Sequence, residues 1–217
     1  GFDVILGNPP WEEATLEEDA FWARNFPGLR ALPQREQESL KAKLRENRPD
    51  LLQQYQAELA EAKATRQALV RGPFPGMGTG DPDLYKAFCW RFWFLVVEKG
   101  GRIGDLLPRS VLAAKGSTEF RLEVFRAARS ADITTLVNNR NWVFDDGHPQ
   151  WTYGLLATER GGEGGASVNL KGPYRSRSEF DAGINDMGAT FVGEEICSWN
   201  DTASLPLLPR EGSVKIF

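Results

Sequence analysis

The first hydrophobic pattern in the chain is a continuous apolar run, Val4–Leu6, that ends abruptly at a glycine and two prolines. A run without polar alternation is typical of a strand that is buried on both faces. Pro9 and Pro10 have no backbone N–H, so neither can continue a sheet ladder, and Pro9 also favours an extended conformation at Asn8. The pattern therefore predicts a buried strand whose C-terminal end presents Asn8 and Trp11. In α/β proteins, ligands bind at that edge of the sheet.

Apolar residues at helical spacing predict helices further along the chain. Residues 33–70 carry one apolar stripe, and Pro49 divides them into a two-helix hairpin because proline is tolerated in the first turn of a helix. Asp81 is expected to cap a strongly apolar helix over residues 82–98. A further amphipathic helix is expected over residues 117–129, with its first serine as the cap.

Short apolar runs between these helices predict strands. Besides the first run, they cover residues 102–107, 133–137 and 151–158. Alternation of strands with helices favours a parallel α/β sheet. The last strand follows a loop without a helix, so the fold class expected is α/β with parallel strands plus one antiparallel strand.

A cluster of glycines at residues 161–165 marks a change of character. We expect residues 1–160 to form one domain, with a helical insertion at about residues 12–80. Residues 161–217 are expected to form an irregular β-rich segment.

Composition narrows the classes of protein that fit. The net charge is −4, so contact with nucleic acid requires a local patch rather than a basic chain. The two cysteines lie far apart and are expected to be reduced thiols in a cytoplasmic protein, and the single histidine excludes a multi-histidine metal site. The longest apolar stretch is too short to span a membrane. Because the chain opens at Gly1 directly into a strand, without an initiator methionine, we expect it to be a piece of a longer protein.

The glycine-rich stretch at residues 72–81 contains G-x-G-x-G ahead of a helix. A cofactor-binding loop of this kind follows a buried strand. The residues before this stretch supply no strand, so a flexible loop is expected.

The order of motifs along the chain resembles the gamma-type DNA adenine N6-methyltransferases. The large methylases of type IIG restriction–modification and phage-defence systems are the most similar members. The motifs that carry the resemblance are F-D-V-I-L-G-N-P-P-W at residues 2–11, D-L-Y at 83–85, G-G-R-I at 100–103 with L-P-R-S at 107–110, an aromatic loop at 137–146, and the strand at 153–158.

The resemblance implies a partial Rossmann-like methyltransferase sheet, followed by a target-recognition region after residue 161. It implies S-adenosylmethionine as the cofactor and double-stranded DNA with a flipped adenine as the substrate. No metal and no membrane are implied. The glycine-rich cofactor loop of this family precedes the N-P-P motif, so it would lie upstream of Gly1. The cofactor-binding residues are therefore unknown, and the 217 residues alone are expected to be inactive.

The chemistry of the first motif follows from its residue types. An adenine N6 amine is a poor nucleophile because its lone pair is delocalised into the ring. The side-chain oxygen of Asn8 and the carbonyl of Pro9 are two acceptors for its hydrogens. Trp11 offers a flat face on which a flipped base can stack. The resemblance also brings Pro10 near the cofactor.

Other residues are candidates for binding the substrate. A base that stacks on Trp11 could have an aromatic side chain on its other face. The residues that follow the second strand could contact phosphate or help to hold the loop. These candidates are Trp142, Phe144 and Trp151 for the wall, and Arg109 and Ser110 for the contact. Lys171, Arg175 and Arg177 are scattered basic residues that could approach the DNA backbone.

Two alternatives stay open. An Asn-Pro-Pro-aromatic motif also serves methyltransferases that act on RNA or on protein glutamine. The chain could instead be a catalytically inactive binding or scaffold fragment that uses the Leu40–Leu59 hairpin.

Overall fold

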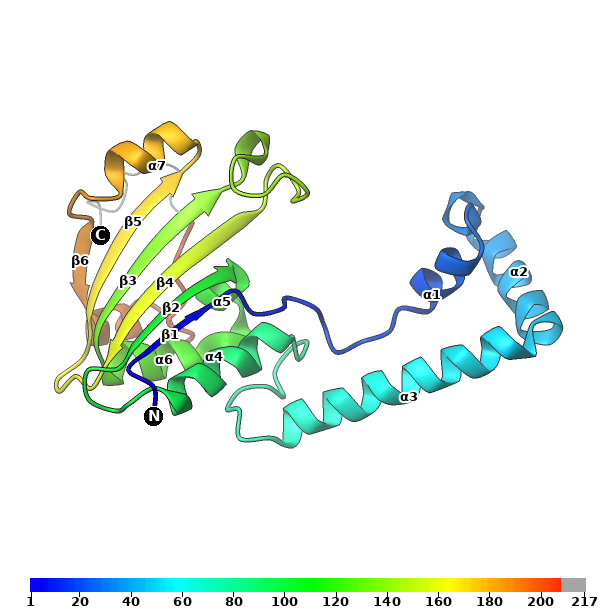
Figure 1. Cartoon of the computed structure of the whole chain (residues 1–217), viewed down its shortest axis with the longest axis horizontal. Helices are drawn as coiled ribbons and strands as arrows, with labels where there is room; N and C mark the ends of the chain where they lie inside the picture. Colours follow the sequence, from blue (N-terminus) through cyan, green and yellow to red (C-terminus); the bar gives the residue numbers. More distant parts are fainter. Residues whose placement is uncertain (208–217) are drawn as a thin grey trace. The chain divides into compact units, whose positions relative to one another are not determined.

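The computed structural model describes residues 1–207, which form two compact units (Figure 1). We call residues 1–12 together with those from 73 onward the core unit, and residues 13–72 the helical unit. The helical unit lies within the insertion that the sequence predicts. No helix among residues 1–207 has the length and apolar character needed to cross a membrane.

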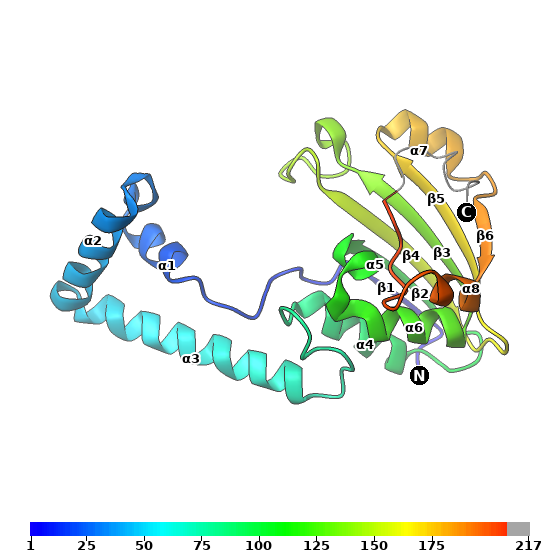
Figure 2. The same cartoon turned by 180° about the vertical axis from the view of Figure 1, so that it is seen from behind.

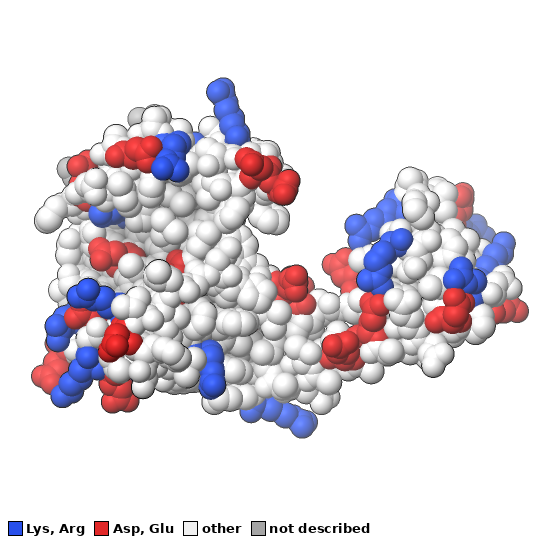
Figure 3. Space-filling model, viewed as in Figure 1, with Lys and Arg blue, Asp and Glu red and all other residues white. Residues whose placement is uncertain are grey.

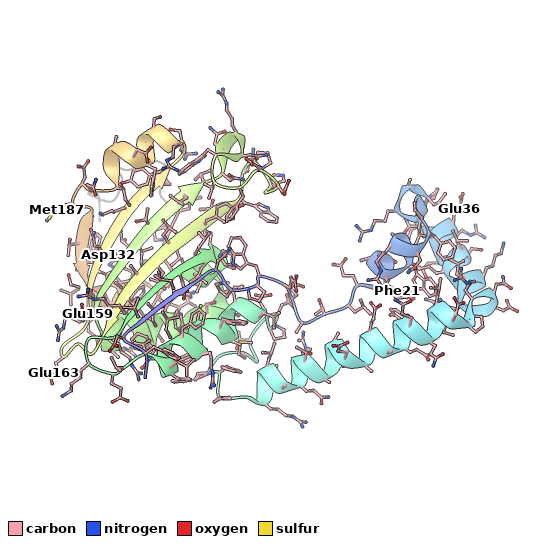
Figure 4. All side chains as sticks on the ribbon, viewed as in Figure 1. Phe21, Glu36, Asp132, Glu159, Glu163 and Met187 are labelled. Carbon is pink, nitrogen blue, oxygen red and sulfur yellow. The ribbon has the colours of Figure 1, made fainter. Side chains whose placement is uncertain are left out.

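The helical unit contains the expected hairpin. Its elements are α1 (Glu18–Asn25), η1 (Leu29–Ala31), α2 (Gln34–Asn47) and α3 (Pro49–Arg71). Pro49 opens α3, where its missing N–H costs no hydrogen bond, so the predicted division of the hairpin is confirmed. The unit has a small core of its own, in which Phe21 (labelled in Figure 4) and Trp22 pack against Leu44 and Leu51.

The core unit has one six-stranded sheet with the order β1-β2-β4-β3-β5-β6. Its strands are β1 (Val4–Gly7), β2 (Arg102–Pro108), β3 (Ala128–Val137), β4 (Thr152–Arg160), β5 (Ser167–Tyr174) and β6 (Ala189–Val192). β1 pairs with β2 and β3 with β5 in parallel, whereas β4 is antiparallel to both of its neighbours. The predicted mixed α/β class and the antiparallel fourth strand are confirmed, and β6 adds a second antiparallel strand.

The sheet continues beyond the glycine cluster at residues 161–165. β5 pairs with β3, and β6 with β5, so the segment after residue 160 extends the same sheet. The carboxyl ends of β1, β2, β3 and β5 meet at one edge, because these four strands run in the same direction.

Helices cover one face of this sheet. The helices of the core unit are α4 (Leu84–Leu95), α5 (Ser110–Ala113), η2 (Lys115–Ser117), α6 (Thr118–Ala127), η3 (Asn139–Asn141), α7 (Arg177–Gly183) and α8 (Gly193–Trp199). Figure 2 shows α4, α6 and α8 on the covered face. Trp93, Phe125, Leu156 and Ile196 belong to the buried core between these helices and the sheet.

The other face of the sheet is open along β1, β2 and β4 in the described part of the core unit. Leu6, Leu106, Leu155 and Thr134 line a hollow of about 600 Å³ on this face. Figure 3 shows the face hollowed, with acidic side chains within it, and Figure 4 labels one of them, Asp132.

Two sequence predictions about element ends and burial are wrong. Val4 is 56% exposed and Leu6 79%, because both side chains lie on the uncovered face of β1, an edge strand with β2 as its one strand neighbour among residues 1–207. α4 begins after Asp83 rather than Asp81, and neither it nor α6 has a side-chain cap. Asp83 pairs instead with the buried ammonium group of Lys86 at 2.8 Å.

A buried arginine ties the end of the described chain to the fold. The guanidinium of Arg121 on α6 donates hydrogen bonds to the carbonyls of Val111 and Ala114, at 2.8 and 2.9 Å, and to those of Thr202 and Ala203, at 2.8 and 3.1 Å. The residue is 2% exposed, and burial lowers the pKa of Arg121 to about 10. Its cation is therefore solvated by backbone carbonyls from segments that lie far apart in the sequence.

We expect Arg121→Ala to lower the free energy of unfolding of the core unit by about 3 kcal/mol or more. The change leaves several buried carbonyls without donors and removes charge-assisted hydrogen bonds. Urea unfolding followed by circular dichroism measures the effect. The matched control is Arg126→Ala on the same helix, since Arg126 is exposed and has one weak ion pair, at 3.9 Å, so its loss costs under about 1 kcal/mol. Equal effects of the two changes would contradict the role assigned to Arg121.

Candidate functional site

Two segments that are far apart in the sequence meet at the carboxyl edge of the sheet. Residues 8–11 follow β1, and residues 138–151 connect β3 to β4. The ring centroids of Trp11 and Phe144 are 6.2 Å apart, and those of Trp11 and Tyr153 are 5.3 Å apart. The structure thus brings Trp11 and Phe144 into contact, and Asn8 lies three residues before Trp11 on the same segment.

The first segment presents two unused hydrogen-bond acceptors. Among residues 1–207, neither the side chain of Asn8 nor the carbonyl of Pro9 takes part in a hydrogen bond. The ladder between β1 and β2 ends at Gly7, and Pro9 and Pro10 cannot extend it because proline nitrogens donate nothing, so the Pro9 carbonyl lies beyond the strand pairing. Asn8 is exposed and lines the hollow on the open face, whereas Pro9 is buried. Acceptors in this position can receive the hydrogens of an amine.

Aromatic side chains gather beside these acceptors. We call the following set the aromatic cluster: Trp11, Trp142, Phe144, Tyr153, Tyr174 and Phe180. Trp11 meets Phe144 edge-on, at an interplanar angle of 89°, and it lies tilted against Tyr153 at 39°. Its indole N–H is buried and has no partner among the described residues. The cluster offers aromatic faces next to an amide, which suits the binding of a planar heterocycle.

Trp142 contacts Phe180 in the cluster. Its indole N–H donates to the carbonyl of Val137 at 2.7 Å, and its ring lies 6.0 Å from that of Phe180. Trp142 therefore packs within the cluster, and Phe144 is the wall candidate that contacts Trp11.

The other predicted substrate-binding residues lie elsewhere. Trp151 is 56% exposed and stacks on His148 rather than joining the aromatic cluster. Arg109 lines a small cavity of about 30 Å³ with Leu112 and Leu205, on the helix-covered face of the sheet. The hydroxyl of Ser110 hydrogen-bonds to Tyr85 at 2.8 Å.

Lys171, Arg175 and Arg177 all interact within the described chain, and the backbone N–H of Arg175 donates to the carboxylate of Glu179 at 2.6 Å. The ammonium group of Lys171 donates to the carbonyl of Ile184 at 2.6 Å. Arg177 pairs with Asp181 at 2.9 Å, one turn along α7. These interactions stabilise the region around α7.

Sequence reasoning missed Tyr153 and Asn138. Tyr153 is the second residue of β4 and is opposite Leu136, so it lies at the same edge as Trp11. Because β4 begins at the edge of the sheet that carries the site, its first inward-facing residue, Tyr153, could have been proposed from the sequence. Asn138 follows β3 directly and is fully buried, at 0% exposed. This burial was not predicted from the sequence, because asparagine is usually exposed.

Among residues 1–207, no glycine-rich turn connects a parallel strand of the sheet to a helix. The G-x-G-x-G stretch follows α3 and leads into α4, as expected for a connecting loop. Its residue Thr79 contacts the turn at Gly116, where a Cβ would lie 2.4 Å from the Thr79 carbonyl oxygen.

A buried carboxyl lies against the glycine of the first motif. A Cβ on Gly7 would lie 2.6 Å from Oδ1 of Asp105 and 2.6 Å from the ring of Phe92, so no side chain fits there. Asp105 is 4% exposed, and its Oδ1 has no hydrogen-bond partner among residues 1–207. Burial raises the pKa of the Asp105 carboxyl to about 7. Burial, and secondarily the charge of Asp105, also raise the pKa of Cys89.

Comparison with protein-family models finds no match, and comparison with curated proteins finds none either. Among solved structures, a modification subunit of a putative type I restriction enzyme from Vibrio vulnificus YJ016 is similar, with 17% identity and a TM-score of 0.49. The likeness covers 94% of this chain and 36% of that one.

Two further structures are similar at a comparable level. The DrdV–DNA complex has 18% identity and a TM-score of 0.45 over 87% of this chain and 17% of that one. The methyltransferase subunit of a type I restriction–modification system from Streptococcus thermophilus has 14% identity and a TM-score of 0.39 over 55% and 29%. The chain thus spans about a third or less of the length of these proteins. Likenesses at this level assign it to no family.

Asp105 gives a pH dependence whose sign can be tested. Because its pKa is about 7 in the folded chain and 3.8 as the ordinary value, the folded chain keeps a proton that the unfolded chain has lost. The contribution of Asp105 to the free energy of unfolding is therefore highest below about pH 4, falls as the pH rises to about 7, and then stays level, a loss of roughly 4 kcal/mol at most. Asp105→Asn should remove this loss, as measured by urea unfolding at pH 4, 6 and 8.

Asp132→Asn is the control, because Asp132 is an exposed carboxyl of the same sheet that accepts a hydrogen bond from Asn169. It should leave the fall between pH 4 and 7 in place. Parallel pH curves for the wild type and Asp105→Asn would contradict the burial of an unpaired carboxyl beneath Gly7.

Proposed function

We propose that this chain is part of a site-specific DNA methyltransferase that transfers a methyl group from S-adenosylmethionine to adenine N6. The enzyme would serve a restriction–modification or phage-defence system. The observation that carries the proposal is the pair of unused acceptors, Asn8 and the Pro9 carbonyl, beside Trp11 at the carboxyl edge of the sheet.

The two acceptors would make the N6 amine a better nucleophile. The side-chain oxygen of Asn8 and the carbonyl of Pro9 each accept one hydrogen of the N6 amine, which directs its lone pair out of the ring plane. Neither acceptor must break an internal hydrogen bond to do so. An amide also avoids the cost of burying a carboxylate against the base.

Trp11 binds the base in this proposal. A flipped base loses its stacking in the duplex, at a cost of a few kcal/mol, and stacking on an aromatic ring offsets part of it. In the structure the rings of Trp11 and Phe144 are perpendicular and in contact, so entry of a base between them requires the Trp11 side chain to turn. DNA as the substrate rests on the order of motifs from residue 2 to residue 158.

A transfer assay tests the substrate class. The protein, as its gene encodes it in full, is incubated with methyl-tritiated S-adenosylmethionine and with DNA, ribosomal RNA or a glutamine-containing protein. We expect label in DNA, in N6-methyladenine after digestion. Label confined to RNA or protein would establish the alternative substrates, and absence of transfer to all three would favour a scaffold.

Asn8→Ala is expected to reduce kcat for methyl transfer by roughly 10²–10³-fold, by analogy with the removal of one group aimed at charge that develops in a transition state. Thermal stability should stay unchanged, because Asn8 is exposed and its side chain makes no hydrogen bond with the described residues. Single-turnover transfer to DNA measures the effect.

The controls use the same residue type. Asn8→Asp keeps a side-chain acceptor oxygen and should retain more activity than the alanine variant. Asn185→Ala removes an exposed amide after α7 and should transfer at the wild-type rate. Wild-type transfer by Asn8→Ala would refute the role of this side chain.

A further inference from the structure

The connection between β3 and β4 is organised by one buried side chain, Asn138. Its Oδ1 accepts hydrogen bonds from the amides of Val143 and Phe144, at 2.9 and 3.1 Å. Its Nδ2 donates to the carbonyl of Phe144 at 3.0 Å, with longer contacts to those of Gly147 and His148 at 3.4 and 3.5 Å. A side-chain amide has two lone pairs and two N–H groups, so Asn138 uses its full capacity inside the loop.

The backbone of Asn138 adds two further bonds. Its N–H donates to the carbonyl of Trp151 at 2.8 Å, and its carbonyl accepts from Asn141 at 3.1 Å. Asn138 therefore joins the start, the middle and the end of a connection without strand structure. The residue is 0% exposed, so water does not compete for these bonds.

The residue held most firmly is Phe144, since both its amide and its carbonyl bond to Asn138. Its ring lies 6.2 Å from Trp11 and 5.1 Å from Tyr153. Gly147 lets the loop approach Tyr153, because a Cβ there would lie 2.6 Å from the Tyr153 hydroxyl and 2.9 Å from Nδ2 of Asn138. The position of Phe144 relative to Trp11 thus depends on one amide.

We propose that Asn138 is a positioning residue of the methyl-transfer site, which acts by fixing Phe144 as the wall that faces Trp11. The inference rests on the proposed function and adds to it a residue that touches neither the base nor the reacting atoms. Asn138 differs in this from Asn8, whose side chain is exposed and makes no hydrogen bond with the described residues.

The first measurement concerns the loop and does not depend on catalysis. In Asn138→Ala, amide hydrogen exchange of Val143 and Phe144 should accelerate by about tenfold or more, because both lose their acceptor. Asn139→Ala is the matched control: the neighbouring amide is exposed and makes no side-chain hydrogen bond within residues 1–207. In Asn139→Ala, the amide hydrogen exchange rates of residues 143 and 144 should equal those of the wild type. Unchanged exchange in Asn138→Ala would overturn the proposal.

The second measurement places Asn138 in the reaction. With the protein as its gene encodes it in full, Asn138→Ala should raise KM for DNA by about tenfold, as expected for a weakened base-stacking wall, with a smaller change in kcat. Phe144→Ala should do the same, and the double variant should be no worse than Phe144→Ala alone, because Asn138 acts through Phe144. Additive effects would overturn the proposal.

The remaining outcomes separate this proposal from the proposed function. A wild-type protein that transfers no methyl group overturns both. A wild-type protein that transfers normally, with Asn138→Ala showing wild-type KM and kcat, overturns the role of Asn138 alone. If Asn138→Ala does not fold, Phe144→Ala decides: an unchanged KM for DNA in that variant refutes the wall, and a raised KM supports it.

Discussion

The missing amide hydrogens of Pro9 and Pro10 are the constraint on which the candidate site depends. A strand normally satisfies its backbone by pairing, and two successive residues without donors end that pairing. The end of β1 therefore leaves the Pro9 carbonyl and the Asn8 amide without partners among the described residues, and the chain leads directly to Trp11 beside the aromatic cluster. The two prolines thus account both for the end of β1 and for the Pro9 carbonyl that is free within residues 1–207.

Two asparagines at this edge are used in opposite ways. Asn138 is buried and fully occupied by its own loop, whereas Asn8 is exposed and makes no hydrogen bond within residues 1–207. The first supplies rigidity, since its bonds compete with no solvent, and the second leaves binding capacity for a ligand. The aromatic cluster contains Phe144 from the β3–β4 loop and Trp11 from the segment after β1, so residues from both segments shape it. An amide suits both tasks because it donates and accepts without carrying charge.

The sequence predicts the order of elements, the hairpin divided at Pro49 and the direction of the fourth strand, because these follow from local periodicity and from loop type. It also selects Trp11 and Phe144, which the structure brings into contact. The exposure of β1 could not be predicted, since an apolar run reads the same at an edge as at the centre of a sheet. Arg109 lies on the helix-covered face, while Tyr153 packs against Trp11. Those placements depend on which strands become neighbours, and that is a non-local property.

The close contact at Gly7 has an evolutionary consequence. Asp105 and Phe92 occupy the space where a Cβ would be, and they come from β2 and α4. A larger residue at position 7 becomes tolerable only after both of these side chains shrink or move, so the three positions form a unit that changes in a required order. A lineage that exchanged Asp105 for a small apolar residue would lose a buried acid, yet position 7 would stay restricted to glycine while Phe92 kept its place. The start of the N-P-P motif is thus held in place by steric partners outside it.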